Sequence, residues 1–582
     1  MESSSIVDLI HLIPLKKHIF ILAPFVLLII LFITSSIFFS PVAKTEGVWI
    51  DTPLQEKAYA NLYYPKNPHM SHPVVIYFHG LSLQNDIDLR WPLELTKRGF
   101  YVLCVDQSGH GRTYGIYPGL QDDVLKPFFF ENVKGVVDYI YSRQDLFNTS
   151  AIGCMGHSLG GWTTLMGTVI EPRINASVSL AGPTNITALG ADFSGFFKNI
   201  GVTLENDFIT NPDLQKNHSV VEYYNGTYGV NPPKNLLLIQ GRYDTLVNVN
   251  QAISAYNLVN DPSKCDLLIV EGAGADHALI NDTVVYATIA WFETKLLGGI
   301  QAPLNYAQFT YVPFYVVYIL ILLGIYSSVF GFSFIIFKVK KSHFKSEDQN
   351  QQFSTDLGDK SYGSAIIDLL LYSLPILLIW LLLFYVQNIV FNYLITLLIG
   401  AILIITFEFI YFFMKSGRSF KLEKVKNVLK TNLHLSGIII AIICAAYFLG
   451  FYYAVAYHFK FLLFGPHSIL LYIISILAIF PFILSYEIFH RKIIQDRFPL
   501  RKERDKWINR ILLFGFGIIS FIPFYYIISG AFISMLVVFI FSIASTTINI
   551  YLYEKTKSVL ATSIFGTLVV GFFLAQCYFL FI

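Results

Sequence analysis

One serine framed by glycines constrains the fold of this chain more than any other feature. Gly156 and Gly160 flank Ser158 in the pentapeptide Gly-His-Ser-Leu-Gly. The apolar run Ala151–Met155 before it suits a buried strand, and the run Gly161–Ile170 after it suits a helix. A sharp strand–turn–helix strains the serine backbone, and side chains two residues away on either side would collide with the strand or the helix. The pattern therefore predicts that the Ser158 hydroxyl is held clear of the chain as a nucleophile.

Two later apolar runs end in residues that could activate this hydroxyl. A serine hydroxyl does not ionise at neutral pH, so it needs a base and an acidic residue that orients the base. Asp244 follows the strand-like run Leu236–Gln240, and we predict that it is the triad acid. His277 follows the run Leu267–Val270 on a glycine-rich loop, and we predict that it is the general base. The order serine, aspartate, histidine is the one used by α/β-hydrolases.

Acyl transfer also needs backbone donors for the oxygen that becomes negative in the tetrahedral intermediate. The predicted strand Pro73–Phe78 ends in a His-Gly turn that leads to Leu81. We predict that the amides of Leu81 and of Leu159, which follows the nucleophile, form the oxyanion hole.

Other polar residues near these motifs have structural interpretations. We expect His157 to point into the fold, and His79 and His110 to brace their turns, although the last two could also touch substrate. We expect Asp276, which precedes the base, to face solvent. A migrated triad acid remains an alternative to Asp244, and the aspartates considered for it are Asp213 and Asp266.

Together these motifs make residues 45–300 resemble the α/β-hydrolase superfamily, and most closely its esterases, lipases and serine aminopeptidases. The resemblance implies a mostly parallel sheet with helices on both faces, an ester substrate, and neither a cofactor nor a metal. It also implies a cap at about residues 186–235. The aromatic residues there could bind an apolar acyl group or form a small separate core: Phe193, Phe196, Phe197, Phe208, Tyr223, Tyr224 and Tyr228.

The rest of the chain has the composition of a membrane protein. Of 582 residues, 54% are hydrophobic and only 14% are charged, which is too apolar for an ordinary soluble protein. After a tail at 1–18, we predict a transmembrane anchor at 19–39 and, within 314–582, an all-α domain of about eight more transmembrane helices. Their predicted positions are 314–337, 365–386, 389–413, 435–456, 468–489, 511–530, 532–553 and 559–582.

Lysine and arginine predict the orientation of these spans. Cations gather in alternate loops, at Lys16 and Lys17, Lys338 to Lys345, 415–430, 491–510, and Lys555 and Lys557. The positive-inside rule then predicts a cytosolic amino terminus and a hydrolase domain on the extracellular or lumenal side. Because the cations mark topology, the net charge of +2 says little about partners, and we expect no nucleic-acid partner. Three acidic residues lie near predicted cytosolic ends, where they can reach water or the basic loops: Asp368, Glu408 and Glu487.

Glycosylation sequons support the same orientation. All six lie in the predicted hydrolase domain and none in the membrane half, which predicts an exported glycoprotein. The candidate glycosylated residues are Asn148, Asn175, Asn185, Asn217, Asn225 and Asn281. Cys104 and Cys154 lie on strands that the family's strand order separates, and the five cysteines show no disulfide framework or zinc spacing.

The sequence thus favours a membrane-integrated serine hydrolase that cleaves esters of lipid-linked or amphiphilic substrates. A membrane-bound serine peptidase of the same fold is one alternative. A transporter or receptor that uses the hydrolase domain as a binding module is another, because a fold alone does not determine function. Membrane lipids are expected partners, and the sequence identifies no protein partner.

Overall fold

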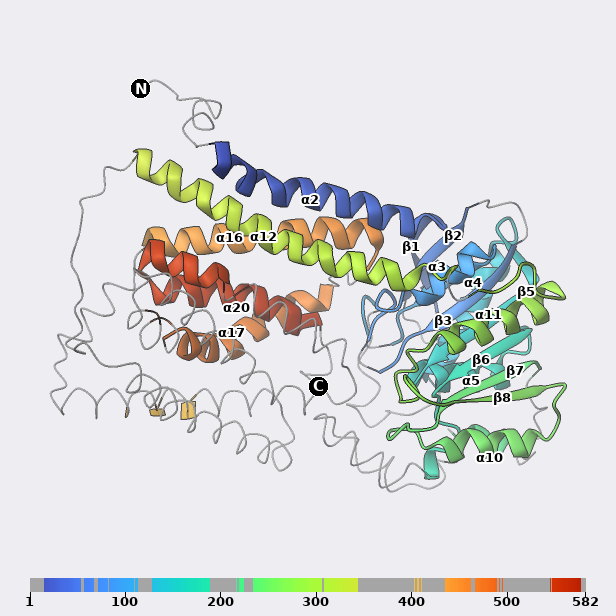
Figure 1. Ribbon diagram of the computed structural model, residues 1–582. Coiled ribbons are helices and arrows are strands. Elements are labelled where there is room, and N and C mark those ends of the chain that lie inside the picture. The colour runs from blue at the N-terminus through green and yellow to red at the C-terminus, as the bar shows by residue number, and fades with distance from the viewer. Residues whose placement is uncertain are drawn as a thin grey trace. The chain divides into compact units, whose positions relative to one another are not determined.

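In the computed structural model the chain forms two compact units (Figure 1). The sheet unit comprises Ser35–Val316, Ala456–Leu470 and Gln576–Ile582, and the helical unit comprises the remainder. The structure describes residues 15–53, 57–66, 72–81, 83–108, 110–113, 128–188, 216, 219–224, 234–305, 308–343, 402–403, 406–407, 410, 435–461, 466–488, 491, 495, 545 and 547–576.

An eight-stranded sheet organises the sheet unit, in the order β1-β2-β4-β3-β5-β6-β7-β8. The β1–β2 and β2–β4 pairs are antiparallel, and every later pair is parallel. The strands are β1 (Val42–Asp51), β2 (Lys57–Pro65), β3 (His72–Phe78), β4 (Tyr101–Val105), β5 (Phe147–His157), β6 (Ala176–Leu180), β7 (Leu236–Gly241) and β8 (Cys265–Val270).

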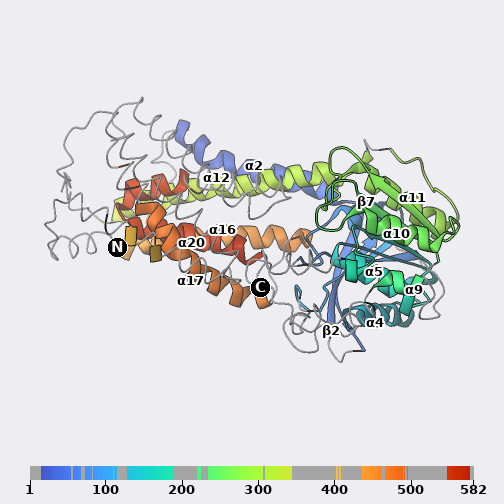
Figure 2. The ribbon, with the colours of Figure 1, turned by 90° about the horizontal axis from the view of Figure 1, so that it is seen from below.

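Helices cover both faces of this sheet, as the sequence predicts. They are α3 (Arg90–Lys97), α4 (Phe128–Ser142), α5 (Leu159–Ile170), α9 (Val220–Tyr224), α10 (Val249–Val259) and α11 (Asp282–Leu297). On one face α5 packs against both α4 and α9 (Figure 2). On the other, Trp91 of α3 contacts Tyr77 of β3, and Phe292 of α11 lies against Gly153 of β5. This is the α/β-hydrolase fold.

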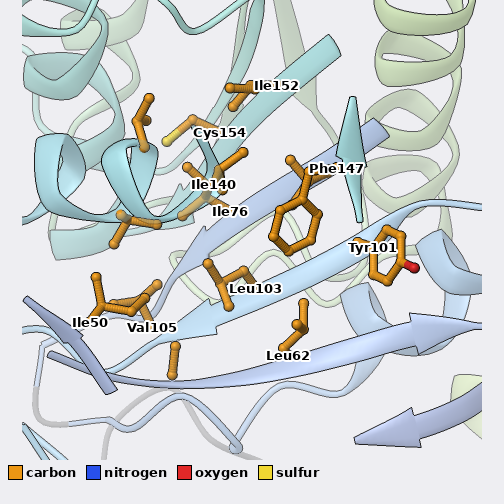
Figure 3. Close-up of a cluster of buried hydrophobic side chains, with 14 of the residues drawn as sticks. Ile50, Leu62, Ile76, Tyr101, Leu103, Val105, Ile140, Phe147, Ile152 and Cys154 are labelled. Atoms are coloured by element: carbon orange, nitrogen blue, oxygen red, sulfur yellow. The ribbon is translucent and has the colours of Figure 1, made fainter. Parts of the chain in front are cut away.

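Apolar side chains on one face of the sheet form a core with the helix that covers it. Figure 3 shows the cluster under α4, where Ile50, Leu62, Ile76 and Leu103 of four adjacent strands meet Ile140 of the helix. All five side chains are at most 1% exposed. Because successive side chains of a strand point to opposite faces, the strands can be buried on both sides by the two helical layers. A parallel sheet covered in this way brings the carboxyl ends of its strands to one edge, where its catalytic loops can meet.

Five long helices account for most of the described part of the helical unit. They are α2 (Leu15–Phe39), α12 (Tyr311–His343), α16 (Leu435–Phe459), α17 (Pro466–Ile488) and α20 (Val559–Gln576). Among the described residues, Tyr311–Phe337 and Leu435–Phe459 are long and apolar enough to cross a membrane, by length and composition. The predicted spans at 365–386 and 511–530 lie outside the described residues, as do most of 389–413 and 532–553, so nine spans remain a prediction.

Glu487, at the end of α17, is buried in the helical unit. It is 1% exposed, and its carboxylate accepts hydrogen bonds from Arg491 at 2.7 Å and from Asn549 at 2.8 Å. Of the two surroundings expected for it, water and the basic loop, the structure shows the second, since Arg491 begins that loop. Asp368 and Glu408 lie outside the described residues.

Candidate active site

Ser158 lies at a tight turn between β5 and α5. Its backbone has φ 54° and ψ −113°, a strained conformation for a residue with a side chain, and its amide donates to Leu180 of β6 at 2.8 Å. A Cβ on Gly156 would overlap the Gly160 carbonyl, and a Cβ on Gly160 would overlap the Phe78 carbonyl. Both glycines are therefore required by close backbone approach, as the sequence pattern predicts.

The structure brings Ser158, His277 and Asp244 together from three different loops. His277 Nε2 lies 2.9 Å from Ser158 Oγ, and His277 Nδ1 lies 2.8 Å from Asp244 Oδ2. The Asp244 carboxylate is fully buried, whereas the His277 side chain is 19% exposed. One imidazole thus connects a hydroxyl that can react with a carboxylate that is shielded from water.

Asp244 is held as an anion by its surroundings. Its Oδ1 accepts the amides of Leu246 at 2.8 Å and Val247 at 2.9 Å. Burial by itself opposes ionisation, but the hydrogen bonds from His277 and these amides outweigh it and lower the pKa of Asp244. A buried side chain that the sequence analysis missed, Gln240, donates to Oδ2 at 2.7 Å. The one feature of the sequence that could have indicated this role is a polar residue at the end of an otherwise apolar strand.

The backbone of the histidine loop is also fixed. His157 Nε2 lies 2.7 Å from the carbonyl oxygen of His277. Burial lowers the pKa of His157 to about 4, so at neutral pH the ring is uncharged and its Nε2–H donates this bond. The expectation that His157 points into the fold matches this arrangement, and its partner is the base itself.

The proposed oxyanion amides belong to adjacent turns. Leu81 follows β3 and Leu159 begins α5, and both are half-buried. A Cβ on Gly80 would lie 3.2 Å from His157 Nδ1, so the β3 turn packs directly beside the Ser158 turn. Within the described residues, neither the Leu81 amide nor the Leu159 amide donates a hydrogen bond to another protein group.

A buried polar network braces the β3 turn. His79 lies 2.7 Å from the Gly80 carbonyl through Nδ1 and accepts from the Gln107 amide at 3.1 Å through Nε2. Gln107 also accepts from Thr163 of α5 at 2.5 Å. His110 lies 2.9 Å from the Ser108 carbonyl. His79 and His110 therefore have the bracing contacts expected of them.

Other residues considered from the sequence lie elsewhere. Asp276 and Asp266 are exposed, and Asp213 lies outside the described residues. In the cap region, Tyr224 is buried in a core cluster with Trp162, and Tyr223 packs against the same cluster. The other cap aromatics lie outside the described residues, namely Phe193, Phe196, Phe197, Phe208 and Tyr228.

Four of the six sequon asparagines are described, and all four are partly exposed. They are Asn148, Asn175, Asn185 and Asn281, whereas Asn217 and Asn225 lie outside the described residues. No group of three or more histidine, cysteine, aspartate or glutamate side chains in the described ranges could hold a metal ion. Cys104 and Cys154 are free thiols on β4 and β5, with β3 between them.

Comparisons with known proteins agree with this geometry. Residues 88–298 match the sequence profile described as "Prolyl oligopeptidase family". A Bacillus subtilis (strain 168) protein named "Putative esterase YitV" is 24% identical over 246 residues, which are 40% of this chain and 92% of that protein. The sheet unit has the α/β-hydrolase fold.

Solved structures of two archaeal hydrolases are also similar to this chain. The Pyrococcus furiosus esterase Pf2001 matches with a TM-score of 0.34 and 21% identity, over 44% of this chain and 93% of its own. A Pyrococcus horikoshii acylaminoacyl peptidase matches with a TM-score of 0.37 and 15% identity, over 45% of this chain and 43% of its own.

Proposed function

We propose that this protein is a serine hydrolase that cleaves carboxylic esters through Ser158, His277 and Asp244. The observation that carries the proposal is the placement of the His277 ring, 2.9 Å from the Ser158 hydroxyl and 2.8 Å from the buried Asp244 carboxylate. A histidine between a strained serine and a buried aspartate has the geometry of a general base.

The chemistry follows in two halves. His277 Nε2 takes the proton of Ser158 as the oxygen attacks the ester carbonyl, and Asp244 stabilises the imidazolium that forms. The Leu81 and Leu159 amides donate to the oxyanion. Collapse of the tetrahedral intermediate expels the alcohol, which takes the proton from His277. Water then attacks the acyl-enzyme with His277 again as the base, which releases the acid and restores Ser158.

We further propose that the substrate is lipid-linked or amphiphilic and that the site faces the extracellular or lumenal side. The apolar composition of residues 314–582, the lysine distribution and the six sequons support this placement. A hydrolase that acts on soluble esters would gain little from so many apolar helices. A long acyl chain leaves a bilayer at a cost of about 0.8 kcal/mol per methylene, so a catalyst held at the membrane suits such a substrate.

A serine peptidase is the second candidate, because the profile matched by residues 88–298 is that of the prolyl oligopeptidase family. The same three side chains can cleave either bond, and they do not by themselves select between an ester and an amide.

The purified full chain in lipid nanodiscs decides between these candidates. We expect hydrolysis of p-nitrophenyl acetate and p-nitrophenyl palmitate, and none by Ser158→Ala. A kcat/KM for an alanine p-nitroanilide above those for both esters would favour the peptidase. Cleavage of acetate without palmitate would contradict the amphiphilic substrate.

A further inference from the structure

A buried arginine holds the loop that carries the base. Arg90, the first residue of α3, donates from its Nη1 to the carbonyl of Leu279 at 2.9 Å. Leu279 follows His277 by two residues, is fully buried, and has φ 51°, a conformation that a leucine rarely adopts. The Arg90 bond thus ends on the strained part of the catalytic loop.

Asp88 fixes the other side of the same guanidinium. Its carboxylate accepts from Arg90 Nε at 3.0 Å and from Nη2 at 2.8 Å, and both side chains are nearly buried. A buried ion pair adds little stability compared with apolar residues of the same size. It does fix direction, because the planar guanidinium makes its bonds in a rigid fork.

The N-terminal end of α12 makes hydrogen bonds both to the start of α3 and to the segment that follows His277. Tyr315 Oη accepts the Leu89 amide, next to Arg90, at 2.9 Å. Tyr311 Oη donates to the carboxylate of Asp282, five residues after His277. Glu94 of α3 accepts the amide of Tyr311 in return, at 3.1 Å. All of these residues belong to the sheet unit.

We propose that Arg90 is a positioning residue for His277. We also propose that Tyr311 and Tyr315, at the start of α12, help to fix the position of the His277 ring. The His277 loop is then held at the His277 carbonyl by His157, at Leu279 by Arg90 and at Asp282 by Tyr311. The contacts made by the start of α12 therefore affect the distance and alignment between His277 Nε2 and Ser158 Oγ. This inference rests on the proposed function, since it concerns the reactivity of Ser158.

Conservative variants test it in the full chain. Tyr315→Phe and Tyr311→Phe keep the rings and remove only the hydroxyls, and Arg90→Lys keeps the charge beside Asp88 but not the fork. We expect each to lower kcat for p-nitrophenyl acetate, and the Tyr311→Phe/Tyr315→Phe double variant to lower it about tenfold, with KM within twofold. Fluorophosphonate titration of active sites gives kcat per reactive molecule, so a loss of folded protein alone would leave it unchanged.

Arg98→Lys is the matched control. Arg98 is the C-cap residue of the same helix and donates to the Ala302 carbonyl at 2.9 Å, without a hydrogen bond to the histidine loop. We expect its kcat per titrated site to equal that of wild type. If the double variant and Arg90→Lys also equal wild type per titrated site, the positioning role is wrong. If wild type itself does not react with the fluorophosphonate, the proposed function fails, and this inference fails with it.

Discussion

At the residue scale, backbone proximity determines most of the site. Ser158 has a positive φ, and the two glycines that flank it leave no room for a Cβ on either side. The packing of the surrounding sheet and helix offsets the conformational strain of this turn. The same packing keeps the Ser158 hydroxyl in one position before substrate binds. Gly160 is the stricter of the two requirements for glycine, because a Cβ there would overlap main-chain carbonyls that cannot move aside.

Gly160→Ala is therefore expected to destabilise the sheet unit by about 3 kcal/mol and to abolish ester hydrolysis. Urea unfolding followed by tryptophan fluorescence measures the first effect. Gly299→Ala is the control, because a Cβ there would meet nothing within 4 Å. Equal stability of the two variants would contradict the close approach at the Ser158 turn.

At the element scale, much of the site follows from strands that end in loops. The sequence predicts Ser158, Asp244 and His277 because each follows an apolar run, and parallel strands bring such ends to one edge. It does not predict the role of Arg90, because its partner Leu279 lies 189 residues away along the chain. The sequence does not predict the antiparallel β1–β2 pair either, because β1 mixes polar and apolar residues irregularly and β2 is buried over almost its whole length.

The buried histidines make these turns sensitive to acid. Burial lowers the pKa of His79, and lowers those of His110 and His157 to about 4, so their stabilising contribution is full above about pH 6.5 and is lost toward pH 4. Burial raises the pKa of Asp106 to about 7, and this opposing contribution grows as the pH falls. Among these four groups, the three histidines outnumber the one aspartate, so their combined effect is to destabilise the folded state as the pH falls below 6.5.

We therefore expect the Tm of the sheet unit to fall as the pH is lowered from 6.5 to 4.5. His110→Asn, which keeps a donor for the Ser108 carbonyl, should reduce the pH dependence by about one proton, or about 1.4 kcal/mol per pH unit. Thermal unfolding across this range measures it. An unchanged pH dependence in the variant would show that His110 is protonated in the folded protein.

At the scale of the whole molecule, one chain combines a unit with the α/β-hydrolase fold and a set of apolar helices. The sheet unit includes residues beyond 300, since Thr310 to Val316 and 456–470 belong to it. The hydrolase boundary predicted at residue 300 therefore leaves out Tyr311, which bonds to Asp282 after the histidine loop, and Tyr315, which bonds to Leu89 before α3. Nothing in the sequence pattern marks them, because they lie in an apolar run that predicts a membrane span.

Glycosylation tests the proposed placement of the domain. Asn175 accepts the Ile152 amide and Asn281 caps α11, so replacing either asparagine would also disturb the fold. Ser177→Ala and Thr283→Ala remove the same two sequons without touching those bonds. We expect endoglycosidase to increase the electrophoretic mobility of the wild-type protein. If a site is glycosylated, the untreated variant that lacks it should migrate faster than untreated wild type by the mass of one glycan. No endoglycosidase shift in protein from a glycosylating host would contradict an exported domain.

The most direct test of the central claim is covalent labelling of the full chain with a fluorophosphonate, which reacts only with an activated serine. We predict that wild type is labelled at Ser158, that Ser158→Ala is not labelled, and that His277→Ala and Asp244→Asn are labelled much more slowly. Ser142→Ala, at an exposed serine on α4, is the control and should be labelled as fast as wild type. Equal labelling of wild type, Ser158→Ala and His277→Ala would contradict the assignment of the nucleophile and the base.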